Sequence, residues 1–279
     1  MKTTVVVTTY NRPDALALTL RGFFLQDDLN FDVIVADDGS NELTRQTVEQ
    51  LKTESPVDLL HVWHEDIGFR AAGIRNKAIR ASRSDYLIFT DGDCVPRKSF
   101  VRKHKELAEK GWFLSGNRVL LSRRLTDDLL NHSIQPNSWG VFTVLRHYLF
   151  RDINRVMPFF SYPTLTLMRK LRPRRWRGVK TCNFSAWKSD LADVNGFEEE
   201  YVGWGLEDSD LIVRLIKKGL RHKSARQATP TLHLWHAEND RSHLKKNEER
   251  LKVLLDTDKT NANLGLEKRK AQSVRRIIE

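Results

Sequence analysis

Two aspartates one residue apart, Asp91 and Asp93, follow directly on the apolar run of residues 86–90 in the segment YLIFTDGDCVP. A run of this kind is typical of a buried strand, so both carboxylates are expected at a strand end, where they can reach the same side of a turn. Such a pair can hold a hard cation. Mg²⁺ or Mn²⁺ held in this way keeps several waters and bridges the phosphates of a substrate.

The same residues also fit the pattern DxDx[TV], the nucleophile loop of haloacid-dehalogenase-type phosphatases. In that interpretation Asp91 attacks phosphorus and Asp93 acts as acid and base. A third interpretation is a solvated turn without any chemistry. The pair alone does not choose among these three, so the rest of the sequence has to decide.

A second acidic pair, Glu207 and Asp208, follows the tripeptide GWG of residues 203–205 at the start of an expected helix over 206–218. Carboxylates in the first turn of a helix can simply complement its dipole, at about 0.3–1 kcal/mol each. That explanation does not account for an indole between two glycines just before them. A planar apolar ring beside a carboxylate suits a sugar, whose C–H face stacks while a hydroxyl donates to the carboxylate.

Strand and helix patterns alternate over the first ninety residues. Strands are expected at residues 3–8, 31–36, 57–63 and 86–90, and helices at 13–26, 41–53 and 73–81. This order predicts an α/β fold, with a Rossmann-like, mostly parallel central sheet and helices on both faces. In such sheets ligands bind beyond the carboxyl ends of the strands. The clusters TTYNR, DDGS and DGD follow three of these strands, and we expect them to converge on one site.

The second part of the chain is less regular. A helix is expected at 97–110, an extended segment at 112–121, strands at 181–187 and 231–236, and a charged helical tail at 251–279. Residues 122–177 show no pattern that assigns them to helix or strand. The chain has 279 residues, of which 40% are hydrophobic and 30% charged, as in globular proteins.

The location expected from composition is cytoplasmic. No apolar run approaches the roughly 20 residues that span a bilayer, and the N-terminus lacks the apolar core of a signal peptide. Cys94 and Cys182 make neither a disulfide framework nor a thiolate zinc cluster.

The formal net charge of +11 indicates a polyanionic neighbour, and the segment at 169–180, RKLRPRRWRGVK, is densely basic. Residues 156–178 are either a buried element followed by a solvated loop, or an apolar segment in the lipid headgroup region whose arginines meet anionic lipid or acceptor phosphates. The second interpretation predicts a peripheral protein on the inner face of the cell membrane. A nucleic-acid binder would explain the charge but not the acidic motifs.

Taken together, the motifs VVVTTYNRP, VIVADDGS, DIGFRAAGIRNKAI and YLIFTDGDCVP resemble those of inverting family 2 glycosyltransferases, which have the GT-A fold. The later NFSAWKSDLADVNGFEEEYVGWGLEDSDLIVRLIKKG and HLWH resemble chondroitin-polymerase-type and β-1,4-galactosyltransferase-type enzymes. The resemblance covers about residues 3–250, with a gap near 122–177. It implies one GT-A domain over 1–250, with a nucleotide-sugar-binding half (1–96) and an acceptor and catalytic half (97–250).

The resemblance assigns the nucleotide pocket after the first strand to three residues, Thr9, Tyr10 and Arg12. It implies that Asp38 accepts from the uracil N–H and that Arg70 or Arg75 contacts base or phosphate. Asp91 would hold the ribose or the metal, and Asp93 the metal that bridges the diphosphate. His236 is the expected further metal ligand, with His233 as its rival. The implied cofactor is Mn²⁺ or Mg²⁺.

For the acceptor side, the resemblance implies that Asp208 is the catalytic base and that Glu207 orients the acceptor. Trp204 and Gly205 would shape the sugar pocket, with Asn183 as a further substrate-binding residue. The implied reaction moves a hexose of the galactose, glucose or N-acetylhexosamine type from a UDP-sugar to a glycan or lipid-linked glycan, as in bacterial lipopolysaccharide, capsule or other surface-polysaccharide synthesis. A single displacement inverts the anomeric centre.

Overall fold

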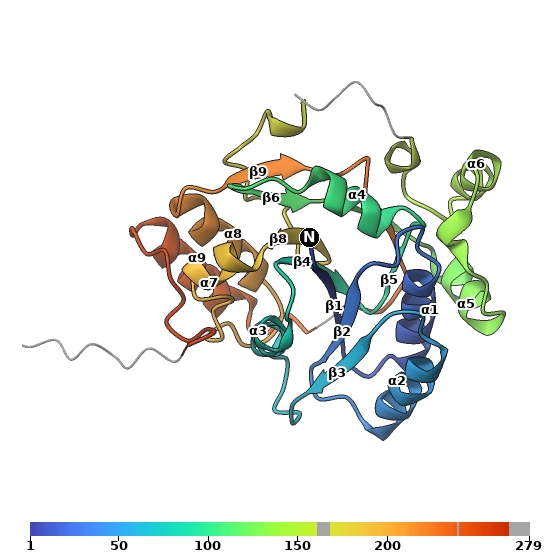
Figure 1. Ribbon diagram of the computed structural model, residues 1–279, viewed down its shortest axis with the longest axis horizontal. Helices are drawn as coiled ribbons and strands as arrows, with labels where there is room; N and C mark the ends of the chain where they lie inside the picture. The colour runs from blue at the N-terminus through green and yellow to red at the C-terminus, as the bar shows by residue number, and fades with distance from the viewer. Residues whose placement is uncertain (161–167, 239, 268–279) are drawn as a thin grey trace, which may run out of the picture.

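The computed structural model describes residues 1–160, 168–238 and 240–267, and its elements are drawn in Figure 1. The larger of its two sheets has seven strands, in the spatial order β3 (Leu59–Trp63), β2 (Asp32–Asp37), β1 (Thr3–Thr9), β4 (Tyr86–Asp91), β8 (Asn183–Trp187), β6 (Trp112–Ser115) and β9 (Arg221–Ser224). The strands from β3 to β4 are parallel, β8 is antiparallel to both neighbours, and β6 pairs parallel with β9. The predicted mostly parallel central sheet is confirmed.

The smaller sheet has three strands, in the order β5 (Cys94–Pro96), β10 (Pro230–His233) and β7 (Asn117–Leu120). In the antiparallel pairing of β5 with β10, Cys94 lies opposite His233. The backbone N–H of Leu234 donates to the carbonyl oxygen of Asp93 over 2.9 Å. This small sheet therefore brings β10 and the residues that follow it beside the DGD turn at 91–93.

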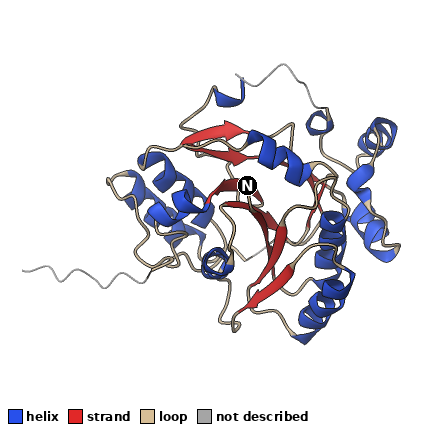
Figure 2. Cartoon of the chain, viewed as in Figure 1, coloured by secondary structure: helices blue, strands red, loops and turns tan. Residues whose placement is uncertain are grey.

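Helices cover both faces of the large sheet, as Figure 2 shows. On one face, β-branched residues of β1 and β2 pack against α1 (Pro13–Phe24), α2 (Glu42–Glu54) and α4 (Phe100–Leu107). On the other face, the alternate side chains of the same strands pack against α3 (Ala71–Ala81), α7 (Lys188–Asp193) and α8 (Glu207–Lys217). The alternation of inward side chains along each strand produces these two apolar cores. A further helix, α9 (Leu244–Leu255), packs on α8.

The segment at 122–177, which the sequence left unassigned, contains α5 (Arg123–Asn131) and α6 (Val141–Leu149). In the described part of this segment, three short 3-10 helices accompany them, at Pro136–Ser138, Met157–Phe159 and Met168–Lys170. Leu125, Leu129 and Val144 pack with residues of the small sheet in a third core. In Figure 1, α5 and α6 form the right-hand edge of the molecule, beyond α1.

Two sequence-based expectations need correction, the extended segment at 112–121 and the helical tail at 251–279. The expected extended segment at 112–121 is two strands in different sheets, because the chain crosses at Gly116, where a Cβ would lie 2.0 Å from Asn183 Oδ1. The short elements α7 and β9 were not expected.

The expected helical tail over 251–279 is helical only to Leu255 within the described residues. From Asp256 to Glu267 the chain is irregular, and its backbone N–H groups at Asn263 and Leu264 donate to the buried Glu198. Residues 268–279 lie outside the described part, and the boundary at residue 250 stays a prediction. None of the described helices combines the length and apolar content needed to cross a bilayer.

Candidate active site

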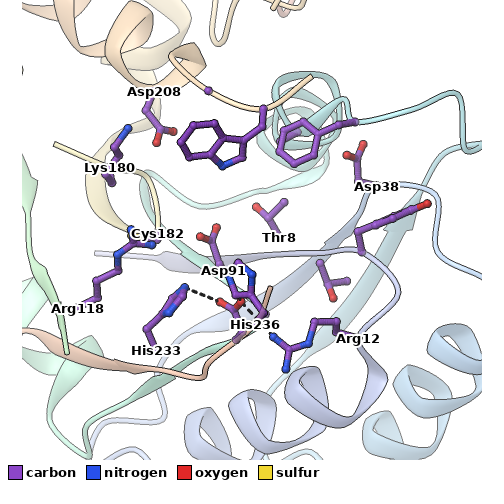
Figure 3. Close-up of a pocket in the computed structure, with 18 of the residues that line it drawn as sticks. Thr8, Arg12, Asp38, Asp91, Arg118, Lys180, Cys182, Asp208, His233 and His236 are labelled. Carbon is purple, nitrogen blue, oxygen red and sulfur yellow. Dashed lines mark ion pairs between the residues drawn. The ribbon is translucent and has the colours of Figure 1, made fainter. Parts of the chain in front are cut away.

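A cavity of about 470 Å³ lies where β1 and β4 end, opposite the first turn of α8 (Figure 3). Because β1 and β4 are parallel, Thr8 is paired with Asp91, and both reach the same edge of the sheet. Most of the residues expected from the sequence line this cavity: Thr9, Tyr10, Arg12, Asp38, Arg75, Asp91, Asp93, Trp204, Gly205, Glu207, Asp208, His233 and His236. The convergence of the strand-end clusters is therefore confirmed.

A buried arginine, Arg75 of α3, connects the two acidic pairs. Its Nη1 donates to Glu207 Oε1 over 3.1 Å and lies 3.6 Å from Asp208 Oδ1. Its Nη2 donates to Asp91 Oδ1 over 3.4 Å, and its Nε donates to Thr8 over 3.2 Å. One guanidinium thus holds three carboxylates from two distant parts of the chain. The family resemblance implies that Arg70 or Arg75 contacts base or phosphate, and that assignment stays a prediction.

Burial and mutual charge set the protonation of this cluster. Burial raises the pKa of Asp91 to about 7, although the charge of Arg75 opposes the rise. Burial and the neighbouring Asp208 raise the pKa of Glu207. For Arg75, burial alone would lower the pKa, but the carboxylates of Asp208, Glu207 and Asp91 raise it, so the guanidinium stays charged.

Asp208 is held on one side only. Its Oδ1 accepts a hydrogen bond from the hydroxyl of Thr181 and faces Arg75, and among the described residues Oδ2 has no hydrogen-bond partner. Asp208 therefore has a fixed orientation and one carboxylate oxygen free to accept a proton from a molecule in the cavity.

The turn before α8 requires unusual backbone angles. Gly203 and Gly205 have φ of 75° and 108°, and Leu206, the N-cap of α8, has φ of 76°. Positive φ is unstrained for glycine but costly for leucine, which persists only because its surroundings hold it. Asn247 of α9 supplies part of that support, since its side-chain amide donates to the carbonyl of Gly205 over 3.0 Å. The turn presents Trp204 to the cavity, where Arg241 lies 5.2 Å from the ring centroid.

A second cluster forms around Asp93 on the opposite side of the cavity. His233 Nε2 lies 3.6 Å from Asp93 Oδ1, and His236 Nε2 lies 3.5 Å from Oδ2. Arg12 Nη1 lies 3.6 Å from Oδ2. The structure thus brings both candidate histidines to the same carboxylate. Either of them, or both, can serve as the further metal ligand expected from the sequence.

The donor atoms of this cluster fit a divalent cation. The Nδ1 of His236 lies 2.6 Å from the carbonyl oxygen of Ala237, so Nδ1 donates to that oxygen and Nε2 is the ring nitrogen that faces Asp93. Burial lowers the pKa of His233 to about 4, so this imidazole is neutral. Imidazole nitrogens and a carboxylate are groups that can coordinate such an ion. Asp93, Cys94 and His233 also place their ligand atoms within 4.8 Å of one another.

Asp38 lies at the far end of the cavity, after β2. Its Oδ1 pairs with His64 Nε2 over 2.7 Å, and its Oδ2 accepts from the backbone N–H of Arg70 over 2.8 Å. Burial raises the pKa of Asp38. Tyr10, which is half exposed, donates to Asp66 over 2.8 Å beside it.

Two expected site residues lie outside the cavity lining. Arg70 contributes its backbone to Asp38, and its side chain is not among the lining residues. Asn183 is buried, and its Nδ2 donates to the carbonyl oxygens of Asn117 and Thr229. Its position supports the crossing at Gly116 rather than contact with a substrate, so the geometry does not favour its assignment to substrate binding.

Two cations that the sequence did not single out line the cavity, Arg118 of β7 and Lys180 (Figure 3). Within the described residues, neither side chain has a carboxylate at ion-pair distance. Lys180 belongs to the basic segment that had been assigned to a membrane or an acceptor. Arg118 has no signal in the sequence, because only the crossing at Gly116 turns it toward the site.

Two family models match this chain. The model for glycosyl transferase family 2 matches residues 4–170, and the one described as the N-terminal domain of galactosyltransferase matches residues 166–237. Both describe transferases, and neither supports the phosphatase interpretation of the DGDCV segment.

Curated relatives agree with these models. Validoxylamine A glucosyltransferase of Streptomyces hygroscopicus subsp. jinggangensis is 30% identical over 233 residues, covering 80% of this chain and 53% of that protein. Chondroitin synthase of Escherichia coli is 26% identical over 243 residues, covering 80% of this chain and 33% of that protein. The chain therefore spans about half or less of the length of these two relatives.

Solved structures share the fold. The mannosyltransferase PcManGT of Pyrobaculum calidifontis, solved with GDP-Man and Mn²⁺, superposes with a TM-score of 0.60 at 18% identity, covering 90% of this chain and 64% of that one. TarS 1-349 of S. aureus, solved with UDP-GlcNAc, gives 0.58 at 18% identity, covering 95% and 68%. Because the family 2 model matches more than half of the chain, this protein belongs to glycosyl transferase family 2, with the GT-A fold.

Proposed function

We propose that this protein transfers a hexose from a UDP-sugar to a hydroxyl of a glycan acceptor, with inversion at the anomeric carbon. One observation carries the proposal: a single cavity holds the half-free carboxylate of Asp208 on one side and the Asp93, His233 and His236 cluster on the other. The first suits a base and the second suits a cation on a diphosphate. A donor sugar between the two would have its reacting carbon facing the base.

In the proposed reaction the acceptor hydroxyl donates to Asp208 Oδ2 and loses its proton to that oxygen as it attacks the anomeric carbon. The bond from that carbon to the diphosphate breaks on the opposite face, and UDP leaves with the electron pair. Thr181 and Arg75 keep the carboxylate in place. Glu207 would orient the acceptor, and the indole of Trp204 would stack on the sugar.

The proposed donor subsite is formed by Thr9, Tyr10, Arg12, Asp38 and Asp91, all of which line the cavity. Asp93, with His233 and His236 and with Asp91 as a further candidate, would hold Mn²⁺ or Mg²⁺. When bound, such an ion neutralises charge that develops on the leaving diphosphate. Arg118 and Lys180 are added to the sequence-based set, because unpaired cations in the cavity can meet the same negative charge.

The relatives support this reaction class without fixing the sugar. The similar proteins include a glucosyltransferase and a chondroitin synthase, and the similar structures hold UDP-GlcNAc in one case and GDP-Man in another. A surface polysaccharide or lipid-linked glycan is therefore the proposed acceptor class. Peripheral contact with an anionic membrane from the cytoplasmic side, through the basic segment at 169–180, is part of the proposal. Arg172, Arg174 and Arg177 of that segment are exposed.

The test is a screen of nucleotide sugars with Mn²⁺ and oligosaccharide acceptors, read as released nucleotide and as glycosylated product. UDP release that needs both the acceptor and Asp208, with an anomeric configuration opposite to that of the donor, is the expected result. Transfer from GDP-mannose alone would overturn the donor assignment. Product with retained configuration would overturn the mechanism.

A further inference from the structure

The side of α6 that faces solvent is apolar. Three of its aromatic and aliphatic side chains are among the most exposed in the structure, with Phe142 at 89%, Leu149 at 80% and Phe150 at 68% of full exposure. We define the α6 surface as Val141, Phe142, Leu145, Tyr148, Leu149 and Phe150. Contiguous apolar exposure of this kind marks an interaction site more often than it marks a free surface.

Helical spacing places the five residues of this surface that belong to α6 on one stripe, and Phe150 follows them as the C-cap residue. The opposite side of α6 is already used. Residues 142, 145 and 149 are three and four positions apart, so their side chains are neighbours. Val144 is buried in the third core, and His147 stacks on Trp139 with ring centroids 4.6 Å apart. Because the buried side fixes the helix, the α6 surface cannot turn inward without breaking these contacts.

The chain over α6 and just after it is basic. From residue 129 to 160 the sequence has three arginines, Arg146, Arg151 and Arg155, and a single acidic residue, Asp152. Arg124 and His147 pair with Asp152 over 2.7 Å and 3.0 Å, so that carboxylate is neutralised. Arg146 and Arg151 are exposed beside the apolar stripe, and within the described part of the chain neither has an acidic partner at ion-pair distance.

We propose that the α6 surface binds an anionic lipid bilayer, with its apolar stripe inserted among the headgroups and its arginines on lipid phosphates. A helix with an apolar stripe and flanking arginines is the arrangement that interfacial helices use. A second copy of this chain fits less well, because a two-fold contact through the same patch would bring Arg146 and Arg151 against their own copies.

The segments on either side of α6 contact the wall of the active-site cavity, so bilayer binding at α6 would place the membrane near that wall. Leu121 lines the cavity and forms a β-bridge with Ile153, just after α6. Arg123, at the start of α5, lies over the ring of Trp235, another lining residue, at 5.1 Å from its centroid. If the proposed function holds, a bilayer on the α6 surface would bring a lipid-linked acceptor near this wall. The bilayer binding itself does not depend on the sugar-transfer reaction.

The experiment is co-sedimentation of the full chain with vesicles of phosphatidylcholine alone and of phosphatidylcholine with phosphatidylglycerol. The parent is expected to bind only the anionic vesicles. F142S/L149S is expected to lower the partition coefficient about ten-fold or more, since it removes the two most exposed apolar side chains of the stripe. R146S/R151S is expected to weaken binding and to reduce its sensitivity to salt.

The matched control is L43S/V253S, which makes the same kind of change at two residues exposed to 58% and 63% on the distant helices α2 and α9. Unchanged binding by this control supports the proposal, and an equal loss in both double variants overturns it. Failure of the parent to bind anionic vesicles also overturns it. So does a parent dimer in solution that F142S/L149S dissociates, which would make the surface a self-association site. No sugar donor is present, so none of these outcomes depends on the transfer reaction.

Discussion

The two acidic pairs of the cavity differ in their partners. Asp91 and Asp93 lie where β4 ends, and Glu207 and Asp208 lie where α8 begins. Glu207 and Asp208 both face the buried guanidinium of Arg75. The other pair separates: Asp91 turns to Arg75, whereas Asp93 turns to two imidazoles and to Arg12. Asp91 is the last residue of β4, whereas Asp93 lies in the turn before β5, and this turn separates the two carboxylates. Glu207 and Asp208 are adjacent in the first turn of α8, where both face one cation.

This difference shows which pair already has its partners within the protein and which pair leaves room for an added ion. The helix pair already has a cation within the protein, since Arg75 faces both of its carboxylates, and Thr181 fixes the orientation of Asp208. Asp93 has an imidazole facing each of its carboxylate oxygens, and Arg12 Nη1 lies 3.6 Å from its Oδ2. We therefore expect loss of the helix pair to stop chemistry, and loss of Asp93 to weaken the binding of the metal and the donor.

The largest effect is expected for Asp208→Asn. The amide keeps the shape of the side chain but cannot take the proton of the acceptor, and loss of a general base costs about 10²–10⁴-fold in rate. Turnover is measured by product formation under saturating donor, and UDP binding by calorimetry. Binding should stay within a few-fold of the parent, and near-parental turnover would remove Asp208 from the mechanism.

Arg75→Met tests the link between the two pairs. It leaves the buried Glu207 and Asp208 and the partly buried Asp91 without their cation, and breaking a buried ion pair costs about 3–5 kcal/mol of the free energy of unfolding. The variant and the parent are compared by urea unfolding. Arg80→Met on the same helix, whose guanidinium bonds only to backbone carbonyls of the loop at 265–266, is the control.

The same variant has a defined pH dependence. Without Arg75, the pKa values of Asp91 and Glu207, already raised by burial, rise further in the folded state. A carboxyl whose folded pKa exceeds its unfolded value destabilises the protein as pH increases through that range. The stability deficit of Arg75→Met should therefore shrink from about pH 8 to about pH 5. A deficit that is constant with pH would mean that packing, not charge, is lost.

Asp93→Ala is expected to have a smaller effect, on the donor. Charge-assisted contacts contribute about 1.5–3 kcal/mol, so donor affinity in the presence of Mn²⁺ should fall about ten- to hundred-fold. Calorimetry of UDP binding with Mn²⁺ and with EDTA measures it. EDTA should weaken binding to the parent and leave binding to Asp93→Ala almost unchanged. If EDTA weakened both equally, the ion would be held elsewhere.

Local patterns were enough to predict much of this site. β-branched runs ending in aspartate predict parallel strands with polar ends, and the GWG turn before two acids predicts a helix start near a sugar. The partners of these residues are not local: Arg75 reaches Glu207 across 132 positions. Its sequence context, an amphipathic helix, gives no sign of three carboxylates around it.

The segment at 122–177 could not be assigned from the sequence for a different reason. In α6 the sequence VFTVLRHYL has apolar residues on the buried side, such as Val144, and on the exposed stripe, such as Phe142. Apolar residues on both sides of a helix blur the 3.6-residue period. Gly116 likewise gave no sign that the chain would change sheets there, because the close approach of Asn183 depends on tertiary structure.

The smallest effect is expected for Lys180→Ala. This variant tests whether a cation that contacts neither acidic pair assists the departure of the diphosphate. Lys180 precedes Thr181, the residue that bonds Asp208, so its ammonium group enters the cavity from the wall of the base. If it meets developing diphosphate charge, kcat should fall about ten-fold, as for the loss of one charge-assisted contact, with little change in donor KM. Lys110→Ala is the matched control, because that ammonium group lies over Trp187, 3.6 Å from the ring centroid, and outside the cavity. A rise in KM with kcat unchanged would place Lys180 on the bound donor instead, and equal behaviour of the two lysine variants would exclude it from the reaction.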